Sequence, residues 1–359
     1  MPTAASSTAG GGDAMKPAEL GYRLPAEWEP HAATWLAWPC RRATWLGDFA
    51  VIPAAYARVA RQIAAFEPVR IVGTAAVLAE ARRHLADVAA VTFIDVPTND
   101  SWIRDTGPVF VKRQVAKAAA DACRLAAVTW DWNAWGGKYP PWDADARVAA
   151  TIAAHLGLHA FAPGIVLEGG AIETDGAGTL LVNERCVVDP KRNPDLGKPA
   201  MERVLRENLG VEKVLWIGGE LAGDDTDGHI DQLARFVAPG RVVAARQPDR
   251  LDPNHEPLQE NLELLATLRD AAGRRLEVIP IDIPPRFAFQ GVQLPASHLN
   301  FYVGNGFVGV PVFGGATDDA ALATLERCFP DRRAVPIDCR EIVRGRGGLH
   351  CITRDEPRA

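Results

Sequence analysis

The chain has 359 residues, of which 48% are apolar, so it can bury a large core in one big domain or two ordinary ones. Its net charge is −6 and no long block of like charges occurs, which argues against nucleic acid or an anionic membrane as partner and favours a cationic ligand. The sequence has neither a membrane-spanning apolar run nor a secretion signal, so we expect a cytoplasmic protein. Its composition is also compatible with a homo-oligomer.

Hydrophobic patterns predict the elements in chain order. Residues 1 to roughly 17 are Ala, Ser, Thr and Gly without periodicity, and such a composition does not become ordered. We predict a disordered tail over residues 1–20 and one catalytic domain over residues 21–359. Helices are predicted over residues 53–66, 75–85, 143–155, 199–209, 256–272 and 318–329. Strands are predicted over residues 34–39, 69–73, 91–96, 108–111, 125–130, 179–182, 214–217, 230–236, 242–245, 276–281, 299–303 and 307–312.

The order of these elements indicates the fold class. Strands outnumber helices about two to one, so the fold is not a plain doubly wound sheet in which one helix follows each parallel strand. No charged or Ser-rich linker interrupts the pattern, which favours a single α/β domain. A strand-rich unit with one helix recurs about five times, and this recurrence suggests a radial assembly around a central site.

Six cysteines are scattered without a Cys-x-x-Cys pair, so we expect reduced thiols. They are Cys40, Cys123, Cys186, Cys328, Cys339 and Cys351. Five of them are interpreted as packing residues, because a free cysteine is usually buried as a small apolar side chain. Cys351 differs, because it follows a glycine-rich turn close to the end of the sequence. We interpret it as a nucleophile.

Three polar segments place acidic residues beside glycines near apolar runs. They are residues 98–108 with Asp100, Trp102 and Asp105, residues 167–176 with Glu168, and residues 223–232 with Asp225, His229 and Asp231. The glycines after Glu168 let backbone and ligand approach closely. Further along the second segment, Asp175-Gly176 is a hairpin turn signal.

The third segment does not fit a metal site. A calcium loop that starts at Gly223 would have Ala234 at its last position, where a bidentate glutamate is required. A zinc site needs more histidine or cysteine ligands than His229 alone supplies. We therefore predict no metal. Because side chains on a strand repeat every two residues, we expect His229 and Asp231 on one face of a strand.

Cys351 needs an acid or base to act as a nucleophile, and His229 is the candidate, with Glu168 as a carboxylate that orients it. His350 is interpreted as structural, because neighbours on an extended chain point to opposite faces. One thiol, one imidazole and several carboxylates, without a cofactor motif, indicate a cationic electrophile as substrate. Carboxylates suit a guanidinium, whose planar fork pairs with them bidentately. We expect a small cationic guanidine as substrate and no cofactor.

Seven motifs carry a resemblance to a known family. They are Pro25-Ala26-Glu27-Trp28-Glu29-Pro30-His31, Asn99-Asp100-Ser101-Trp102-Ile103-Arg104-Asp105-Thr106-Gly107-Pro108, Trp135-Gly136-Gly137-Lys138-Tyr139, Glu168-Gly169-Gly170, Asp225-Thr226-Asp227-Gly228-His229-Ile230-Asp231, Asn300-Phe301-Tyr302 and His350-Cys351-Ile352-Thr353. In these motifs the sequence resembles the agmatine deiminase family, related to bacterial peptidylarginine deiminases within the guanidino-group-modifying superfamily. The resemblance implies a five-bladed, pseudo-symmetric α/β propeller in a single domain.

The resemblance also implies catalytic roles. Cys351 matches the family's nucleophile, His229 its general acid and base, and Glu168 the acid that hydrogen-bonds the histidine. The implied reaction is the hydrolysis of agmatine to N-carbamoylputrescine and ammonia through a covalent thiouronium on Cys351. Neither a metal nor an organic cofactor is implied.

The implied substrate contacts involve four further positions. Asp105 and Asp231 match the pair that clamps the guanidinium, Trp102 matches a pocket wall, and Asp225 matches an acid near the substrate's amine end. These roles rest on the resemblance alone.

Departures from the family pattern gather around the nucleophile. The family commonly has Gly-Gly-Gly-Asn-Ile-His-Cys-Ile-Thr-Gln-Gln, and here Arg346, Gly348, Leu349 and Arg354 replace the second glycine, the asparagine, the first isoleucine and the first glutamine. The two arginines either weaken binding of a diamine-like substrate or point to solvent.

Two alternatives to agmatine hydrolysis remain from the sequence. One is a deiminase of free arginine or of a C-terminal peptidyl-arginine, in which Arg346 or Arg354 pairs with the α-carboxylate, although Asp225 would repel that group. The other, less favoured because Cys351 and His229 are both present, is a non-catalytic guanidine-binding protein.

Overall fold

The structure is a computed structural model that describes residues 15–113 and 124–359. In these residues the chain forms eighteen strands and nine α-helices, so the predicted excess of strands is confirmed. The strands are β1 (His31–Ala37), β2 (Val69–Gly73), β3 (Val91–Asp95), β4 (Val109–Lys112), β5 (Leu125–Val128), β6 (Ala160–Phe161), β7 (Ile172–Thr174), β8 (Thr179–Asn183), β9 (Lys213–Ile217), β10 (Ala234–Ala238), β11 (Arg241–Arg246), β12 (Glu277–Asp282), β13 (Ala288–Phe289), β14 (Val292–Gln293), β15 (Tyr302–Gly304), β16 (Phe307–Val312), β17 (Arg333–Asp338) and β18 (Arg354–Pro357).

The α-helices alternate with these strands, and several short 3-10 helices connect them. The α-helices are α1 (Ile52–Ala64), α2 (Ala75–Leu85), α3 (Ile103–Thr106), α4 (Ala134–Gly137), α5 (Asp145–His155), α6 (Glu184–Val187), α7 (Lys198–Leu209), α8 (His255–Thr267) and α9 (Asp318–Cys328). The 3-10 helices are η1 (Ala18–Leu20), η2 (Arg42–Thr44), η3 (Phe49–Val51), η4 (Gly169–Ala171), η5 (Ile230–Gln232) and η6 (Ile342–Gly345).

Five sheets share one pattern of strands. Four of them are β4-β5-β6, β7-β8-β9, β10-β11-β12 and β15-β16-β17, and the fifth is β18-β1-β2-β3. In each sheet the first strand pairs antiparallel with the second, and the second pairs parallel with the third. A parallel pair needs a crossover connection, and a helix supplies it each time. The recurrence read from the sequence thus corresponds to five sheets of like topology.

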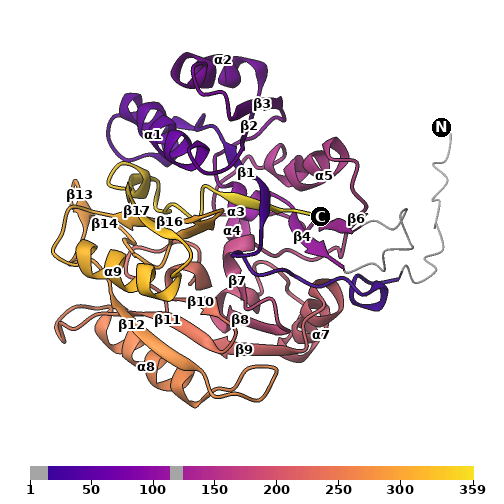
Figure 1. Cartoon of the computed structure of the whole chain (residues 1–359), viewed down its shortest axis with the longest axis vertical. Coiled ribbons are helices and arrows are strands. Elements are labelled where there is room, and N and C mark those ends of the chain that lie inside the picture. The colour runs from indigo at the N-terminus through magenta and orange to yellow at the C-terminus, as the bar shows by residue number, and fades with distance from the viewer. Residues whose placement is uncertain (1–14, 114–123) are drawn as a thin grey trace, which may run out of the picture.

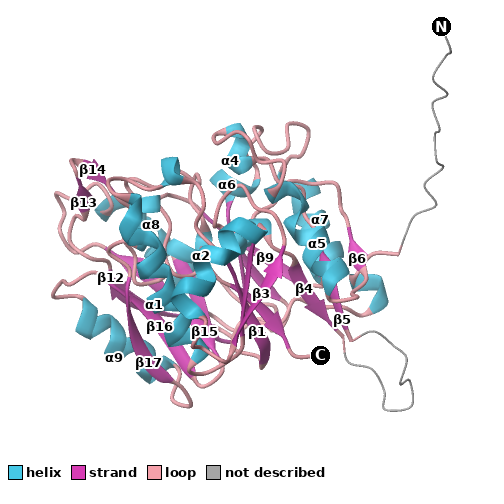
Figure 2. Ribbon diagram, turned by 90° about the horizontal axis from the view of Figure 1, so that it is seen from above, coloured by secondary structure: helices cyan, strands magenta, loops and turns pink. Residues whose placement is uncertain are grey.

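The five sheets surround the middle of the molecule, and the longer helices α1, α2, α5, α7, α8 and α9 lie on the outside (Figure 1). Helix α1 illustrates how such a helix packs on the sheets. One face carries apolar residues at helical spacing that are all buried, namely Ile52, Tyr56, Val59 and Ile63. Seen from above, α4, α6 and the small β13-β14 hairpin lie along one face of the molecule (Figure 2).

Most predicted elements are present within two or three residues of the expected bounds, and α2, β2 and β16 match them. One prediction with functional weight is wrong, because residues 230–236 do not form a continuous strand. The chain forms the 3-10 helix η5 and only then β10, after Asp227 and Gly228 with φ of 67° and 96°. This left-handed pair of residues turns the backbone just before His229, and a strand cannot begin there.

Two regions of the sequence predictions need a separate statement. Residues 1–14 of the expected tail, and Cys123, lie outside the described residues, while η1 falls inside the segment predicted as tail. The five described cysteines are free thiols. None of the helices in the described part of the chain has the length and apolarity that crossing a bilayer requires.

Candidate active site

A cavity of about 150 Å³ opens beside Cys351. Its lining includes four of the seven predicted site residues, namely Trp102, Asp105, Asp225 and Cys351. Three more of them, Glu168, His229 and Asp231, are buried behind this lining and have 0–1% of their surface exposed. The structure therefore brings all seven into one region, in two layers.

Cys351 lies in a turn between η6 and β18, and the prediction of an extended backbone next to it is wrong. The side-chain amide of Asn300 holds this turn, because Oδ1 accepts from the His350 backbone N–H at 2.8 Å and Nδ2 donates to Cys351 Sγ at 3.3 Å. Burial, and then the carboxylates of Asp231 and Asp105, raise the pKa of the Cys351 thiol well above its ordinary value. In this state the thiol is protonated.

Two carboxylates stand next to the thiol. Asp105, in the short helix α3, accepts from the Gly170 backbone N–H at 2.9 Å and from Trp135 Nε1 at 3.1 Å. Asp231, in η5, has Oδ2 at 3.8 Å from Cys351 Sγ. Its other oxygen, Oδ1, is buried and has no hydrogen-bond partner among the described residues. The pair thus places two buried carboxylates near the nucleophile, and Asp231 keeps one acceptor unused.

Gly170 explains how the two layers come together. A Cβ at this position would lie 2.6 Å from His229 Nδ1, 3.0 Å from Asp105 Oδ1 and 3.1 Å from Asp231 Oδ2. Only a residue without a side chain fits between these three groups. The expectation of a close approach at the glycines after Glu168 is therefore confirmed, although the partners are side chains of the site.

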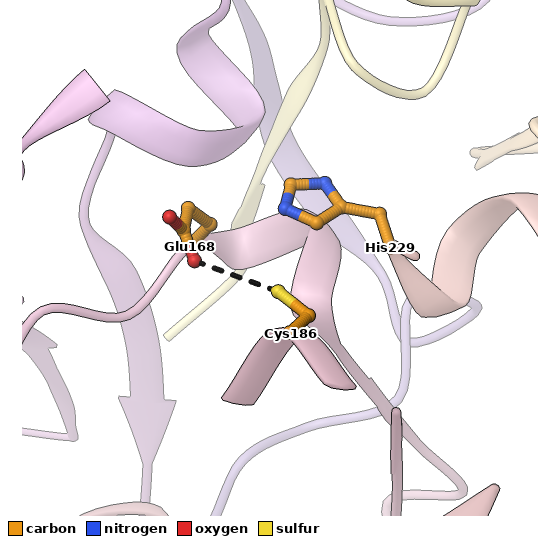
Figure 3. Close-up of side chains that lie close together, drawn as sticks. All are labelled: Glu168, Cys186 and His229. Atoms are coloured by element: carbon orange, nitrogen blue, oxygen red, sulfur yellow. Dashed lines mark hydrogen bonds between the residues drawn. The ribbon is translucent and has the colours of Figure 1, made fainter. Parts of the chain in front are cut away.

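His229 and Glu168 do not form the direct hydrogen bond that was predicted. Figure 3 shows the imidazole of His229 turned toward Glu168 and Cys186, and the ligand atoms of the three lie within 4.8 Å of one another. Glu168 Oε1 accepts instead from Arg192 Nε at 2.7 Å, and Oε2 lies 3.9 Å from Cys186 Sγ. The cation of Arg192 competes for the carboxylate, and no sequence pattern relates Glu168 to this partner 24 residues away.

The charge of His229 follows from its neighbours. Burial lowers its pKa, but Asp105, whose Oδ1 lies 3.8 Å from Nδ1, together with Cys186 and Glu168, raises the pKa to well above the ordinary value. His229 is therefore an imidazolium in this state, while the Cys351 thiol is neutral. A protonated histidine is the form that gives a proton to a leaving group.

One cluster in the described residues has the composition of a metal site, namely Glu168, Cys186 and His229. All three are buried, and Arg192 already neutralises the carboxylate at 2.7 Å. A divalent cation would have to share Glu168 with that guanidinium. The prediction of a metal-free site stays a prediction.

The mouth of the cavity carries both charge signs. Asp225 accepts a hydrogen bond from the Tyr139 hydroxyl, and Arg346 Nη1 lies 3.8 Å from Asp225 Oδ2. Burial raises the pKa of Asp225. Trp102 forms a wall, where it stacks on Trp45 with ring centroids 5.6 Å apart. Gly345 and Gly347 pack against Trp102, since a Cβ on either would come within 3 Å of its ring.

The two arginines that depart from the family pattern have different surroundings. Arg346 lines the cavity with 38% of its side chain exposed and has a left-handed backbone with φ of 68°. Arg354 is buried in β18, away from that cavity, where it donates to the backbone carbonyl of Arg104. Burial and the nearby Arg104 lower the pKa of Arg354 to about 10. Only Arg346 is in a position to meet a ligand.

Several residues of the site were not assigned a role from sequence. Asn300, Trp135 and Tyr139 occur in motifs that carried the resemblance, but nothing in their spacing relates them to Cys351 or Asp105. Arg192 lies in no motif. His350 has a larger part than a purely structural interpretation gives it, because its ring contacts Asp231 Oδ2 at 2.7 Å.

Comparisons with known proteins agree with this geometry. The model of a family described as Porphyromonas-type peptidyl-arginine deiminase matches residues 23–357. An agmatine deiminase of Ectopseudomonas mendocina is 38% identical, over 94% of this chain and 96% of that protein. One of Pseudomonas aeruginosa is also 38% identical, with the same coverage. The solved structure of an agmatine deiminase of Enterococcus faecalis is 34% identical with a TM-score of 0.89, and covers 96% of this chain and 98% of that one.

Proposed function

This chain belongs to the family of Porphyromonas-type peptidyl-arginine deiminases, and from that membership we propose that it hydrolyses agmatine to N-carbamoylputrescine and ammonia. The observation that carries the proposal is a buried thiol, Cys351, flanked by the two buried carboxylates Asp105 and Asp231 at a small cavity. A guanidinium is the cation whose planar N–H fork matches two carboxylates. The product is a precursor of putrescine, so the reaction belongs to polyamine synthesis.

Each step follows from ordinary covalent catalysis. The Cys351 thiolate forms a bond to the guanidinium carbon while Asp105 and Asp231 accept hydrogen bonds from its nitrogens. His229 gives a proton to one nitrogen, the C–N bond breaks, and ammonia leaves behind a thiouronium on sulfur. Water then loses a proton to His229 and attacks the same carbon. The C–S bond breaks, the hydroxyl of the adduct gives up its proton to solvent, and the neutral ureido product and the thiolate are released.

Binding of the cationic substrate promotes ionisation of the nucleophile. Without ligand, burial and the two carboxylates hold the Cys351 thiol neutral through its raised pKa. A guanidinium bound between Asp105 and Asp231 compensates their charge and adds its own positive field, so it lowers that pKa and the thiol proton is released to solvent as the cation binds. We assign a separate role to Glu168 and Arg192, which is to set the local charge next to the imidazole of His229.

Asp225 is the group that favours agmatine over arginine. Its carboxylate lies at the mouth with Tyr139, where the ammonium end of agmatine would be attracted and the α-carboxylate of arginine repelled. Arg346, 3.8 Å away, is the specific observation behind the second candidate, a deiminase of free or C-terminal arginine, since its guanidinium would pair with a carboxylate. Trp102 is proposed as the wall along the substrate's alkyl chain.

We propose in addition that the five sheets of like topology are the blades of a pseudo-symmetric propeller, and that residues 21–359 make up the catalytic domain. Strand order and the recurring antiparallel and parallel pairs support the blades. In this arrangement Cys351, His229 and the acids come from different blades to one centre, which accounts for their wide separation in sequence.

A colorimetric ureido assay on agmatine, arginine and a short peptide with C-terminal arginine tests the function. We expect turnover of agmatine, with arginine and the peptide slower by at least about a hundredfold in kcat/KM. Turnover of arginine but not of agmatine would contradict the proposal. Cys351→Ala should lose at least about four orders of magnitude in kcat and still bind agmatine in calorimetry. Cys328→Ala, whose thiol is outside the cavity, serves as the control.

A further inference from the structure

His350, the neighbour of the nucleophile, connects two buried carboxylates. Its Nδ1 lies 2.7 Å from Asp231 Oδ2 and its Nε2 lies 2.6 Å from Glu27 Oε2. The ring is only 2% exposed, so water does not compete for either contact. Each short contact is at full hydrogen-bond distance.

These two contacts fix how many protons the group holds. An ionised carboxylate only accepts hydrogen bonds, and a neutral imidazole has a single N–H to donate. Two nitrogen-to-oxygen contacts of this length therefore need two protons shared by Glu27, His350 and Asp231. With both acids ionised, the ring is an imidazolium.

The surroundings decide where the negative charge stays. Glu27 Oε2 is also 3.1 Å from Arg104 Nη2 and 3.3 Å from Arg235 Nη2. Burial opposes ionisation of Glu27, but His350, Arg235 and Arg104 outweigh it and hold its pKa well below the usual value. For Asp231, too, burial is outweighed by His350, so its pKa is lowered. Burial and the cations of Arg104 and Arg235 lower the pKa of His350 itself, against the two carboxylates that raise it. The two short contacts nevertheless need two protons, so these are shared within the group of Glu27, His350 and Asp231.

Asp231 shows the effect of this connection. Its Oδ2 is engaged by His350, which fixes the orientation of the carboxylate. Its Oδ1 is fully buried and has no partner among the described residues. A buried carboxylate oxygen that is left unpaired needs a donor. Asp231 lies behind the lining of the cavity with Oδ2 3.8 Å from Cys351 Sγ, so a ligand N–H beside the thiol is the donor that this carboxylate lacks.

We propose that His350 is a positioning residue which, with Glu27 behind it, holds Asp231 in the orientation in which its carboxylate, beside Cys351, accepts an N–H of the bound guanidinium. This inference rests on the proposed function only in that the ligand carries a guanidinium. Glu27 and His350 also line a second, smaller cavity with Arg104 and Gly169, which shares no lining residue with the cavity of Cys351.

Two isosteric substitutions separate the two contacts of the ring. The amide nitrogen of Asn lies close to the place of Nδ1, and that of Gln close to the place of Nε2. His350→Asn keeps a donor for Asp231, whereas His350→Gln keeps only the contact with Glu27. We expect His350→Gln to raise the KM for agmatine at least about tenfold, and His350→Asn to raise it less than about threefold.

Calorimetry on each variant combined with Cys351→Ala should show the same contrast in the dissociation constant of agmatine. His298→Asn and His298→Gln are the controls, since His298 is equally buried and bonded at both nitrogens, to Pro311 O and Thr317 Oγ1, but lies outside the site. They should leave the KM unchanged. A purely structural role of His350 predicts equal effects of Asn and Gln, and that result would overturn the proposal.

Two further experiments apply if a variant does not fold or if agmatine is not the substrate. If His350→Gln does not fold, Glu27→Gln decides, because it removes the outer charge and should raise the KM about three- to tenfold; an unchanged KM refutes the inference. If the enzyme turns over arginine and not agmatine, the proposed function fails while the Asn and Gln contrast, measured with arginine, still tests His350. The two hypotheses are thereby distinguished.

Discussion

At the scale of single residues, the chemistry depends on charges that burial has made strong. Burial, together with Asp231 and Asp105 beside it, raises the pKa of Cys351 and keeps it neutral, and the same carboxylates attract the cation that ionises it. A site of this kind reacts slowly with neutral electrophiles at neutral pH and is selective for cationic ones. The charge of the ligand is therefore part of the catalytic machinery.

Asp231→Asn tests this electrostatic argument. The carboxylate of Asp231 raises the pKa of the Cys351 thiol, so its loss lowers that pKa and increases the thiolate fraction at any pH below it. We expect Asp231→Asn to react with neutral iodoacetamide severalfold faster than the wild type at about pH 8, while turnover is lost. In the wild type, the rate should rise with pH from about 7 to 9 without a plateau. A slower reaction of the variant, or a plateau below about pH 8, would refute the assignment.

Arg346→Gly restores the residue common in the family and removes a cation 3.8 Å from Asp225. The side chain is 38% exposed, so solvent screens the pair and its effect is small. We expect the KM for agmatine to fall about two- to fivefold, and stability to be kept because glycine adopts the positive φ of this position easily. Arg340→Ala, in an exposed pair with Asp338, should not change the KM. A rise in KM would show that Arg346 helps binding.

At the scale of elements, short turns set the positions of catalytic groups more than regular strands do. His229 precedes η5 and Asp231 lies within it. Asp105 is in the four-residue helix α3, and Glu168 precedes η4. Gly170, in η4, is the point where these turns meet. A displacement of one of these turns therefore shifts the side chains held by the others.

Gly170→Ala tests that contact. The added Cβ would meet His229, Asp105 and Asp231 at 2.6–3.1 Å, and none of the three is free to move far because all are buried. We expect kcat to fall about a hundredfold or more with a largely preserved fold, measured by turnover and circular dichroism. Gly218→Ala is the matched control, since it has a negative φ and nothing within 4 Å. Equal loss in both variants would contradict the role given to Gly170.

The limits of sequence prediction are clearest at this scale. Apolar periodicity located the long helices and the inner strands, because each has one buried face. It missed the short strands β6, β7, β13 and β14, and also β17 and β18. Strand β18 reads Arg-Asp-Glu-Pro and is buried through ion pairs instead of apolar contacts, so it has no apolar pattern to detect. It read residues 230–236 as one strand, because the apolar pattern does not reveal that Asp227 and Gly228 adopt left-handed backbone angles.

At the scale of the whole molecule, the nucleophile depends on pairing between distant parts of the chain. Strand β18, which follows Cys351 directly, pairs with β1. The carboxylate of Glu356 fastens it by accepting from Trp35 Nε1 at 2.8 Å and from Arg70 Nη1 at 2.6 Å. The motifs identified the participants of the site, but contacts over such separations are not readable from one sequence.

Glu356→Ala tests this fastening. Its loss leaves the Trp35 N–H and the Arg70 guanidinium without their partner, which should lower the free energy of unfolding by about 1–3 kcal/mol. Thermal and urea denaturation measure the loss, and kcat should fall because the turn of Cys351 is loosened. Asp338→Ala, which removes an exposed pair with Arg340, should cost less than about 1 kcal/mol. Equal stability of Glu356→Ala and the wild type would contradict the argument.

The pairing of β1 with β18 also has a consequence in time. Trp35 and Glu356 are 321 residues apart, and contacts of such separation form late, because the entropy of closing the long loop between them is lost before the contact is made. Partly folded forms of this chain, even with most of their sheets complete, have no ordered nucleophile. During refolding from denaturant, recovery of activity should therefore lag behind recovery of secondary structure. The recovery of enzymatic activity thus reports on the last step of folding in this protein.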